Sequence, residues 1–314
     1  MRFVASIVAC IAIAVAVAAG VYGLRSTKGA GATAAVPPYS VPLDRLDTAL
    51  HCSGPPAAPT ALLVPGTGDT PQRAYSPMWA PGLRRAGYRV CEVVLPLRAT
   101  GDIQVSAEYV ARAVQRLSAS PVPLYVLTHS QGALEVRWAL KYFPTASGRV
   151  REVVELGAPN HGISTVPDLC RPTVTCQPAV MQMMPGSKFL SALNNGPQTP
   201  GGASYVSFFS LTDEIIRPVS PPTAALAGGR NVAFQSICPA RSVSHASMLY
   251  DPWVFAVVTA VLGRPAAPLA GFAARCATPL PSSPFRHPAP KSGEARPGPE
   301  PPLAPYAARS TVSG

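Results

Sequence analysis

The sequence has few charged residues and no cluster of basic ones. Only 13% of the 314 residues are Asp, Glu, Lys or Arg, and 7% are aromatic. The net charge of +11 is concentrated at the ends, because residues 1–40 carry +3 and residues 264–314 carry +4. The 223 residues between them carry +4 without a Lys/Arg cluster. Since nucleic-acid binding needs a concentrated basic face, we expect no nucleic-acid partner.

The sequence also lacks the spacing of a zinc site. It has seven cysteines but no CxxC pair, and no histidine stands at ligand spacing from a cysteine. We therefore expect no metal, and nothing implies an organic cofactor. If Cys10 is removed with an export signal, six cysteines remain, and an even number indicates disulfides in an exported protein. Sequence alone permits 15 pairings of six cysteines.

Both ends of the chain are expected to lie outside the folded domain. Residues 1–36 begin with Arg2 and a long apolar run, which we interpret as a signal peptide or an N-terminal membrane anchor. Twelve of the 38 prolines lie in residues 265–314. Because proline removes backbone donors, we expect residues 281–314 to form a Pro-rich disordered tail. Residues 37–280 remain as one domain, since 47% of the chain is hydrophobic.

Segments typical of strands and of helices alternate along this domain. The expected strands are 61–64, 89–95, 124–127, 150–156, 205–211 and 231–237. The expected helices are 78–85, 104–117, 131–142 and 252–262. Residues 157–186 show no clear period, so we interpret them as an excursion over one end of the sheet. This alternation predicts an α/β fold with a mainly parallel central sheet and helices on both faces.

Ser130 lies directly between an expected strand and an expected helix, in the sequence Thr128-His129-Ser130-Gln131-Gly132. A tight strand-to-helix turn projects such a serine above the sheet, as the nucleophile elbow of the α/β-hydrolase fold does. The segment departs from G-x-S-x-G because Thr128 stands at its first position. A bare S-x-G is usually only a turn, so the interpretation depends on the placement between strand and helix.

The order of the chain then selects a base for Ser130, because in this fold the acid and then the base follow the nucleophile. His161 follows too closely to leave room for an acid at the end of an intervening strand. His287 falls in the proline-rich tail, where nothing would hold it. His245 therefore is the candidate base.

The acid must lie between the nucleophile and the base. The acidic residues there are Glu135, Glu152, Glu155, Asp168, Asp213 and Glu214. Asp213 closely follows the expected strand 205–211, where an acid would emerge at the carboxyl end of the sheet. Its neighbour Glu214 is expected to face the other way. In this hypothesis His245 takes the proton of Ser130 during attack on an ester, and Asp213 orients the imidazole.

The negative charge that develops on the ester oxygen needs preorganised donors. The backbone N–H of Gln131 is the first candidate. The second is expected in the loop Pro65-Gly66-Thr67-Gly68, which follows the first strand and brings backbone close to the nucleophile. Thr67 is the residue that we expect to contribute there, and its hydroxyl is a further donor.

With these residues placed, most of the mature domain resembles the lipases typified by Candida antarctica lipase B, members of the α/β-hydrolase superfamily. The motifs that carry the resemblance are LVPGTG (63–68), LTHSQG (127–132), YFP (142–144), TDEIIRP (212–218) and SHA (244–246). The resemblance implies a triad of Ser130, Asp213 and His245, with oxyanion donors at Thr67 and Gln131. It also implies the disulfides Cys52–Cys91 and Cys238–Cys276, which leaves Cys170–Cys176 as a third pair.

Three positions depart from the family pattern in ways that bear on the substrate. His129 replaces Trp, Asn160 replaces Asp, and Met183 replaces Gln. We interpret Met183, with Met181 and Met184, as the lining of an apolar acyl channel, with ordinary core packing as the alternative. His129 is expected to make the alcohol side of the site smaller and more polar.

The sequence therefore predicts a secreted serine hydrolase whose catalytic domain spans residues 37–280. It would cleave carboxylic esters of lipids through an acyl-enzyme, as a triacylglycerol lipase or carboxylesterase. An acyltransferase or polyester hydrolase with the same triad is one alternative, and a non-catalytic cell-surface binding protein is another. The expected partner is a lipid or small ester. We expect a monomer, with membrane or lipid-interface contact through the apolar N-terminus as an option.

Overall fold

A computed structural model describes residues 37–143, 149–165 and 176–276. The expected signal or anchor (1–36), the expected tail (281–314) and Cys170 lie outside these ranges. Among the helices within them, none has both the length and the apolar content needed to cross a bilayer.

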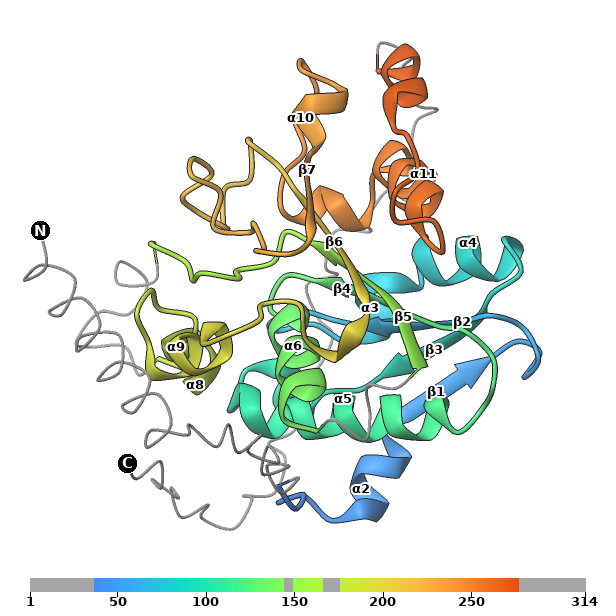
Figure 1. The fold of residues 1–314 in the computed structure, drawn as a ribbon, viewed down its shortest axis with the longest axis vertical. Coiled ribbons are helices and arrows are strands. Elements are labelled where there is room, and N and C mark those ends of the chain that lie inside the picture. Colours follow the sequence, from blue (N-terminus) through green and yellow to red (C-terminus); the bar gives the residue numbers. More distant parts are fainter. Residues whose placement is uncertain (1–36, 144–148, 166–175, 277–314) are drawn as a thin grey trace, which may run out of the picture.

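The described residues form one seven-stranded sheet with the strand order β1-β3-β2-β4-β5-β6-β7 (Figure 1). Only β1 is antiparallel, because it pairs with β3 in the opposite direction. The strands are β1 (Leu50–Ser53), β2 (Thr60–Val64), β3 (Arg89–Val93), β4 (Leu124–His129), β5 (Val150–Leu156), β6 (Ser204–Phe209) and β7 (Arg230–Ala233). The mainly parallel α/β sheet that the sequence predicts is confirmed.

Helices cover both faces of this sheet (Figure 1). The α-helices are α2 (Leu43–Thr48), α3 (Pro71–Tyr75), α4 (Trp79–Arg85), α5 (Ile103–Ser118), α6 (Gly132–Tyr142), α8 (Pro178–Gln182), α9 (Lys188–Asn194), α10 (Phe234–Ile237) and α11 (Pro252–Val261). Short 3-10 helices occur at Ala246–Leu249 and Ala270–Arg275, and helical turns that contain left-handed residues occur at Pro96–Ala99 and Pro200–Gly202.

The alternation of strand side chains divides the core into two layers. Along β2, Leu62 and Val64 pack with α2, α5 and α6, while Ala61 and Leu63 pack with α3, α4 and α11. Every residue of β2 is buried because both faces of a parallel sheet are covered by helices. Successive side chains of a strand point to opposite faces, so one apolar run serves both layers.

The strand order reverses between β2 and β4. From β2 the chain moves outward to β3 and then crosses back to β4 on the other side of β2. The carboxyl ends of β2 and β4 are in register, with Val64 opposite Thr128. Ligands of open α/β sheets bind at the carboxyl ends of strands beside such a switch point. This edge carries the candidate site.

Several expected elements differ from the structure at the sheet borders. The expected strand 231–237 ends at Ala233, and the chain continues as α10. The helix places Phe234 and Ile237 on one buried face, whereas a strand would turn them to opposite sides. Strand β1 was not expected, because it is a largely exposed edge strand without a buried alternation. The expected strand 205–211 stops at Phe209, two residues early.

Candidate active site

Ser130 stands on a sharp turn between β4 and α6. Its φ angle is 55°, in the left-handed region that residues other than glycine rarely adopt. The turn fits because glycines flank it in space. A Cβ on Gly66 would lie 2.8 Å from Ser130 Cβ, and a Cβ on Gly132 would lie 2.6 Å from Val64 O. The left-handed serine and the two close approaches together are typical of a nucleophile elbow.

Thr128 occupies the position where the elbow pattern has its first glycine. It is completely buried, as the penultimate residue of β4, and its hydroxyl lies 3.5 Å from Val154 O of the neighbouring strand. The elbow is also bound to β5, because Ser130 N donates to Leu156 O at 2.8 Å. The threonine is therefore accommodated within the sheet.

His245 and Asp213 form a hydrogen-bonded pair at the same edge of the sheet. His245 Nδ1 lies 2.9 Å from Asp213 Oδ2, and both residues are buried. The other carboxylate oxygen, Asp213 Oδ1, accepts the backbone N–H groups of Ile215 and Ile216, each at 2.8 Å. These local bonds fix the carboxylate, which in turn fixes the ring of His245.

The backbone of His245 is held by two more side chains. Glu214 Oε2 accepts the backbone N–H of His245 at 3.0 Å. Glu214 therefore holds the backbone of His245, while Asp213 holds its ring. His129 Nε2 lies 3.1 Å from His245 O, and because a carbonyl can only accept, His129 carries its proton on Nε2. Burial lowers the pKa of His129 to about 3, which keeps this ring neutral.

The imidazole of His245 lies beside the residues that flank Ser130. Its ring centroid is 4.6 Å from that of His129, which directly precedes the serine. A Cβ on Gly157 would lie 3.1 Å from His245 Nδ1, and Gly157 follows the residue that bonds Ser130 N. No hydrogen bond joins Ser130 Oγ to His245 Nε2 within the described residues. Such bonds are often long in ligand-free enzymes and tighten when substrate binds.

The structure brings Thr67 and Gln131 together across the elbow. The Thr67 hydroxyl donates to Gln131 Oε1 at 2.5 Å. Across the described residues, the backbone N–H groups of Thr67 and Gln131 have no hydrogen-bond acceptor. Gln131 is completely buried, and a buried N–H without an acceptor is uncommon. The lack of a protein acceptor suits the role of oxyanion donors, which stays a prediction for both residues.

Asn160 and Met183 are more enclosed than a substrate-facing position requires. Asn160 is completely buried, and its amide is engaged with Arg137, Glu155 and Ala224 O at 3.2, 2.7 and 2.9 Å respectively. Met183 is 3% exposed within the core. Contact of these two residues with substrate stays a prediction.

Sequence reasoning missed a set of buried carboxyl groups around the site. Burial raises the pKa of Glu135 to about 8 and that of Glu155 to about 7. Glu135 accepts a hydrogen bond from Gln131 Nε2 at 2.6 Å. Gln131 and Glu135 are four residues apart at the start of α6, so their side chains lie on one face of the helix. This spacing was the signal in the sequence that the two side chains would be in contact. Nothing in the sequence indicated that Glu214 would bond the backbone of His245.

The structure contains the disulfides Cys52–Cys91 and Cys238–Cys276, the two pairs that the family resemblance implies. Cys176 is also disulfide-bonded. Its expected partner, Cys170, lies outside the described residues. Within those residues, no group of three His, Cys, Asp or Glu side chains is arranged to hold a metal ion.

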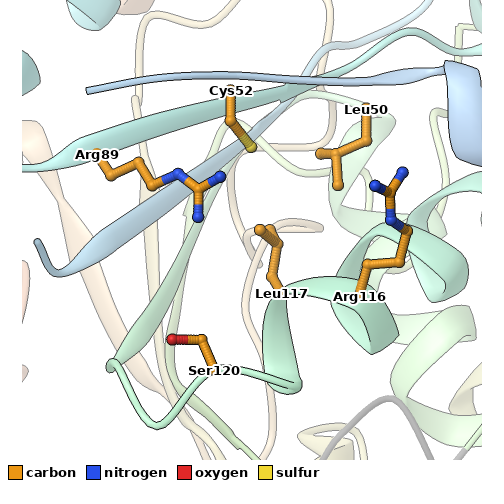
Figure 2. Close-up of a pocket in the computed structure, with 6 residues that line it drawn as sticks. All are labelled: Leu50, Cys52, Arg89, Arg116, Leu117 and Ser120. Carbon is orange, nitrogen blue, oxygen red and sulfur yellow. The ribbon is translucent and has the colours of Figure 1, made fainter. Parts of the chain in front are cut away.

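A surface cavity of about 200 Å³ has a lining that includes none of the candidate site residues. Figure 2 shows the six residues that line it. Arg89 and Arg116 flank it, with Leu50, Cys52, Leu117 and Ser120 completing the wall. Arg89 begins β3 and Ser120 precedes β4, whereas Leu50 lies opposite Val93 at the end of β3, so the cavity lies along the edge strand β1. The cavity is therefore separate from the residues of the candidate active site.

Comparison with known proteins identifies the family of this chain. The chain is 32% identical to lipase B of Pseudozyma antarctica over 233 residues, which are 70% of this chain and 67% of the relative. The chain belongs to the lipase B family. No protein-family model matches it.

Two solved lipase structures have a fold similar to that of this chain. The crystal structure of Aspergillus fumigatus lipase B matches with a TM-score of 0.68 at 25% identity, covering 76% of this chain and 63% of that one. The chain thus spans less than two thirds of the Aspergillus lipase. The mature Bacillus licheniformis lipase BlEst2 matches with a TM-score of 0.51 at 15% identity, over 67% of this chain and 96% of that one. The latter likeness shows the α/β-hydrolase fold alone.

Proposed function

We propose that this member of the lipase B family hydrolyses carboxylic esters through an acyl-enzyme on Ser130. The observation that carries the proposal is the Asp213–His245 pair, bonded at 2.9 Å beside a left-handed serine at the switch point of the sheet. Membership of a lipase family supports ester hydrolysis as the reaction. The assignment of each residue to a role rests on the geometry described above.

The first half-reaction would begin with attack of Ser130 Oγ on the ester carbonyl. His245 Nε2 takes the hydroxyl proton while the new C–O bond forms, and Asp213 holds the ring in the tautomer that leaves Nε2 free. The carbonyl oxygen becomes an anion, which the N–H groups of Gln131 and Thr67 would bind. Collapse of this intermediate expels the alcohol, which receives its proton from His245 and leaves an acyl group on Ser130.

In the second half-reaction water replaces the alcohol and follows the same path in reverse. His245 takes a proton from water, the hydroxide adds to the acyl carbon, and the same two N–H groups bind the oxyanion. As the acyl–Oγ bond breaks, His245 returns its proton to Ser130 Oγ, which releases the carboxylic acid and restores Ser130. All groups return to their starting protonation states, so no cofactor is needed for this step.

We propose a lipid or small ester as the substrate and an exported, extracellular location. Disulfides persist in oxidising compartments, and the Cys52–Cys91 and Cys238–Cys276 bonds support such a location. His129 and Met183 remain our candidates for contacts on the alcohol and acyl sides.

A fluorophosphonate probe and a series of p-nitrophenyl esters test the proposal together. The probe should label the wild-type protein and not Ser130→Ala, and ester turnover in that variant should fall by roughly 10⁶-fold or to background. Labelling of both proteins, or of neither, would contradict the role of Ser130. Increasing rates from acetate to longer acyl chains support a lipid substrate, whereas a strict preference for acetate argues against it.

A further inference from the structure

The side chain of Gln131 lies at the junction of three segments. Its Oε1 accepts the Thr67 hydroxyl at 2.5 Å, and its Nε2 donates to Glu135 Oε1 at 2.6 Å and to Ala99 O at 2.8 Å. Both amide protons are thereby used, and the residue is completely buried. The amide links helix α6, the loop after β2 and the segment before α5 around one candidate oxyanion donor.

Glu135 supplies the most enclosed of these contacts. It follows Gln131 by one turn of helix, is completely buried, and its second oxygen, Oε2, has no hydrogen-bond partner within the described residues. Burial raises its pKa to about 8, so the carboxyl group is neutral at pH 7. A neutral group suits this position, because a buried anion one amide away would oppose the negative charge that develops on the substrate.

The segment Leu97–Ala99 is strained and is held by the same junction. Three consecutive residues that are not glycine have left-handed φ angles of 51°, 52° and 58°. Such conformations cost free energy and persist only where surrounding contacts impose them. Here Ala99 O accepts a hydrogen bond from Gln131 Nε2, and Arg98 O accepts one from Gly68 N at 2.7 Å. The strain is therefore balanced by bonds to the two oxyanion segments.

We propose that Glu135 is a positioning residue of the oxyanion hole, acting through the Gln131 amide on Thr67. Glu135 fixes the rotamer of Gln131, and Gln131 holds the Thr67 hydroxyl, so the two backbone N–H groups are directed at one point. The Thr67 hydroxyl serves as a brace in this arrangement, because its proton is already given to Gln131. This inference rests on the proposed ester hydrolysis.

The test compares Glu135→Met, which lacks an acceptor, with Glu135→Gln, which keeps one in a neutral side chain of the same shape. Turnover of a soluble p-nitrophenyl ester gives kcat and KM for each. Because oxyanion contacts act in the transition state, we expect Glu135→Met to lower kcat by about 10- to 100-fold with KM within about twofold. Glu135→Gln should stay within about threefold of wild type in kcat.

Glu152 provides a matched control at the far end of the domain. Its carboxyl group is also buried, has one oxygen without a partner, and accepts a backbone N–H from Gly263 at 2.6 Å. Glu152→Met therefore removes an equivalent buried carboxyl that has no contact with the oxyanion residues. We expect it to lower the melting temperature while leaving kcat within about twofold of wild type.

The outcomes separate this inference from the proposed function. If the wild type turns over esters and Glu135→Met has the same kcat, the role of Glu135 alone is overturned. A loss of kcat in Glu135→Gln as large as that in Glu135→Met also overturns it. A wild-type protein that neither turns over esters nor reacts with the fluorophosphonate overturns both proposals. If Glu135→Met does not fold, it is replaced by Glu135→Leu, by Thr67→Val and by the double variant that combines these two substitutions. The losses from Glu135 and Thr67 should then be clearly less than additive, and additive losses overturn the inference.

Discussion

The two sides of Ser130 are held in different ways. On the acid–base side, His245 is bonded at its ring by Asp213 and at its backbone by Glu214 and His129. On the oxyanion side, one amide, Gln131, links Thr67 to a buried and neutral carboxyl group. In the proposed reaction the ring of His245 becomes a cation, and the first side places carboxylates beside it. The ester oxygen becomes negative in that reaction, and the second side places a neutral carboxyl group near it.

Carboxyl side chains therefore have different surroundings on the two sides of Ser130. Asp213 accepts two backbone N–H groups through Oδ1, and its Oδ2 lies 2.9 Å from Nδ1 of the imidazole. Glu135 accepts the side-chain amide N–H of Gln131, its Oε2 has no partner in the described part of the chain, and burial raises its pKa to about 8. Both carboxyl groups are buried, and they differ in the hydrogen-bond donors that surround them.

The largest effect is expected from weakening the acid–base side at its ring. Asp213→Asn keeps the shape of the side chain but favours the wrong tautomer of His245. We expect kcat to fall by about 10⁴-fold, with the melting temperature within a few degrees. Glu214→Gln is the matched control, since its amide oxygen can still accept His245 N, and it should lose less than about tenfold. A milder loss in Asp213→Asn than in Glu214→Gln would reverse our assignment of the acid.

A smaller effect is expected from releasing the backbone of His245. His129→Phe keeps a ring beside that of His245 but removes the N–H that donates to the carbonyl oxygen of His245. We expect about a tenfold lower kcat for short soluble esters, because the imidazole is less well placed. His129→Gln, which restores a donor, should recover part of the rate. If both variants change only KM, His129 acts on substrate binding alone.

The last effect is on stability instead of on rate, and it isolates the oxyanion side. The pKa of Glu135 is raised by burial from 4.5 to about 8, so its stabilising contribution is complete below pH 4.5 and is lost as the pH rises to 8. Wild type should therefore lose more free energy of unfolding between pH 5 and pH 8.5 than Glu135→Gln does. The difference should be on the order of 1 to a few kcal/mol, measured by urea denaturation.

The comparison of the two proteins removes the contribution of another buried group. His129 contributes with the opposite sign, because its pKa is lowered to about 3 and its stabilising contribution is lost as the pH falls below 6.5. This contribution is the same in both proteins and cancels in the comparison. Parallel losses in wild type and Glu135→Gln would show that Glu135 is already ionised at neutral pH.

The features that sequence reasoning located are those with a local signal. Ser130 follows an apolar strand and precedes a helix, and Asp213 and His245 follow in the order that the fold requires. The central strands β2, β4 and β5 were found because both of their faces are buried. Contacts that join distant segments gave no local signal. The bonds of Glu214 and His129 to the backbone of His245 depend on how loops meet after folding.

The borders of the sheet were harder to predict for the same physical reason. Strand β1 pairs along only one side, and its side chains are mostly exposed, so no hydrophobic period marks it. Helix α10 follows β7 without a break, and its choice of helix over strand depends on packing of Phe234 against Phe208 and Trp253. Tertiary packing decided these elements, and local propensity did not.

A structure of the fluorophosphonate adduct tests the central claim most directly, because its phosphoryl oxygen imitates the oxyanion. We predict a covalent bond to Ser130 Oγ, with that oxygen within about 3 Å of both Gln131 N and Thr67 N. His245 Nε2 should face the leaving-group side, with Asp213 still bonded to Nδ1. An adduct on another residue, or a phosphoryl oxygen directed away from these two N–H groups, would contradict the account.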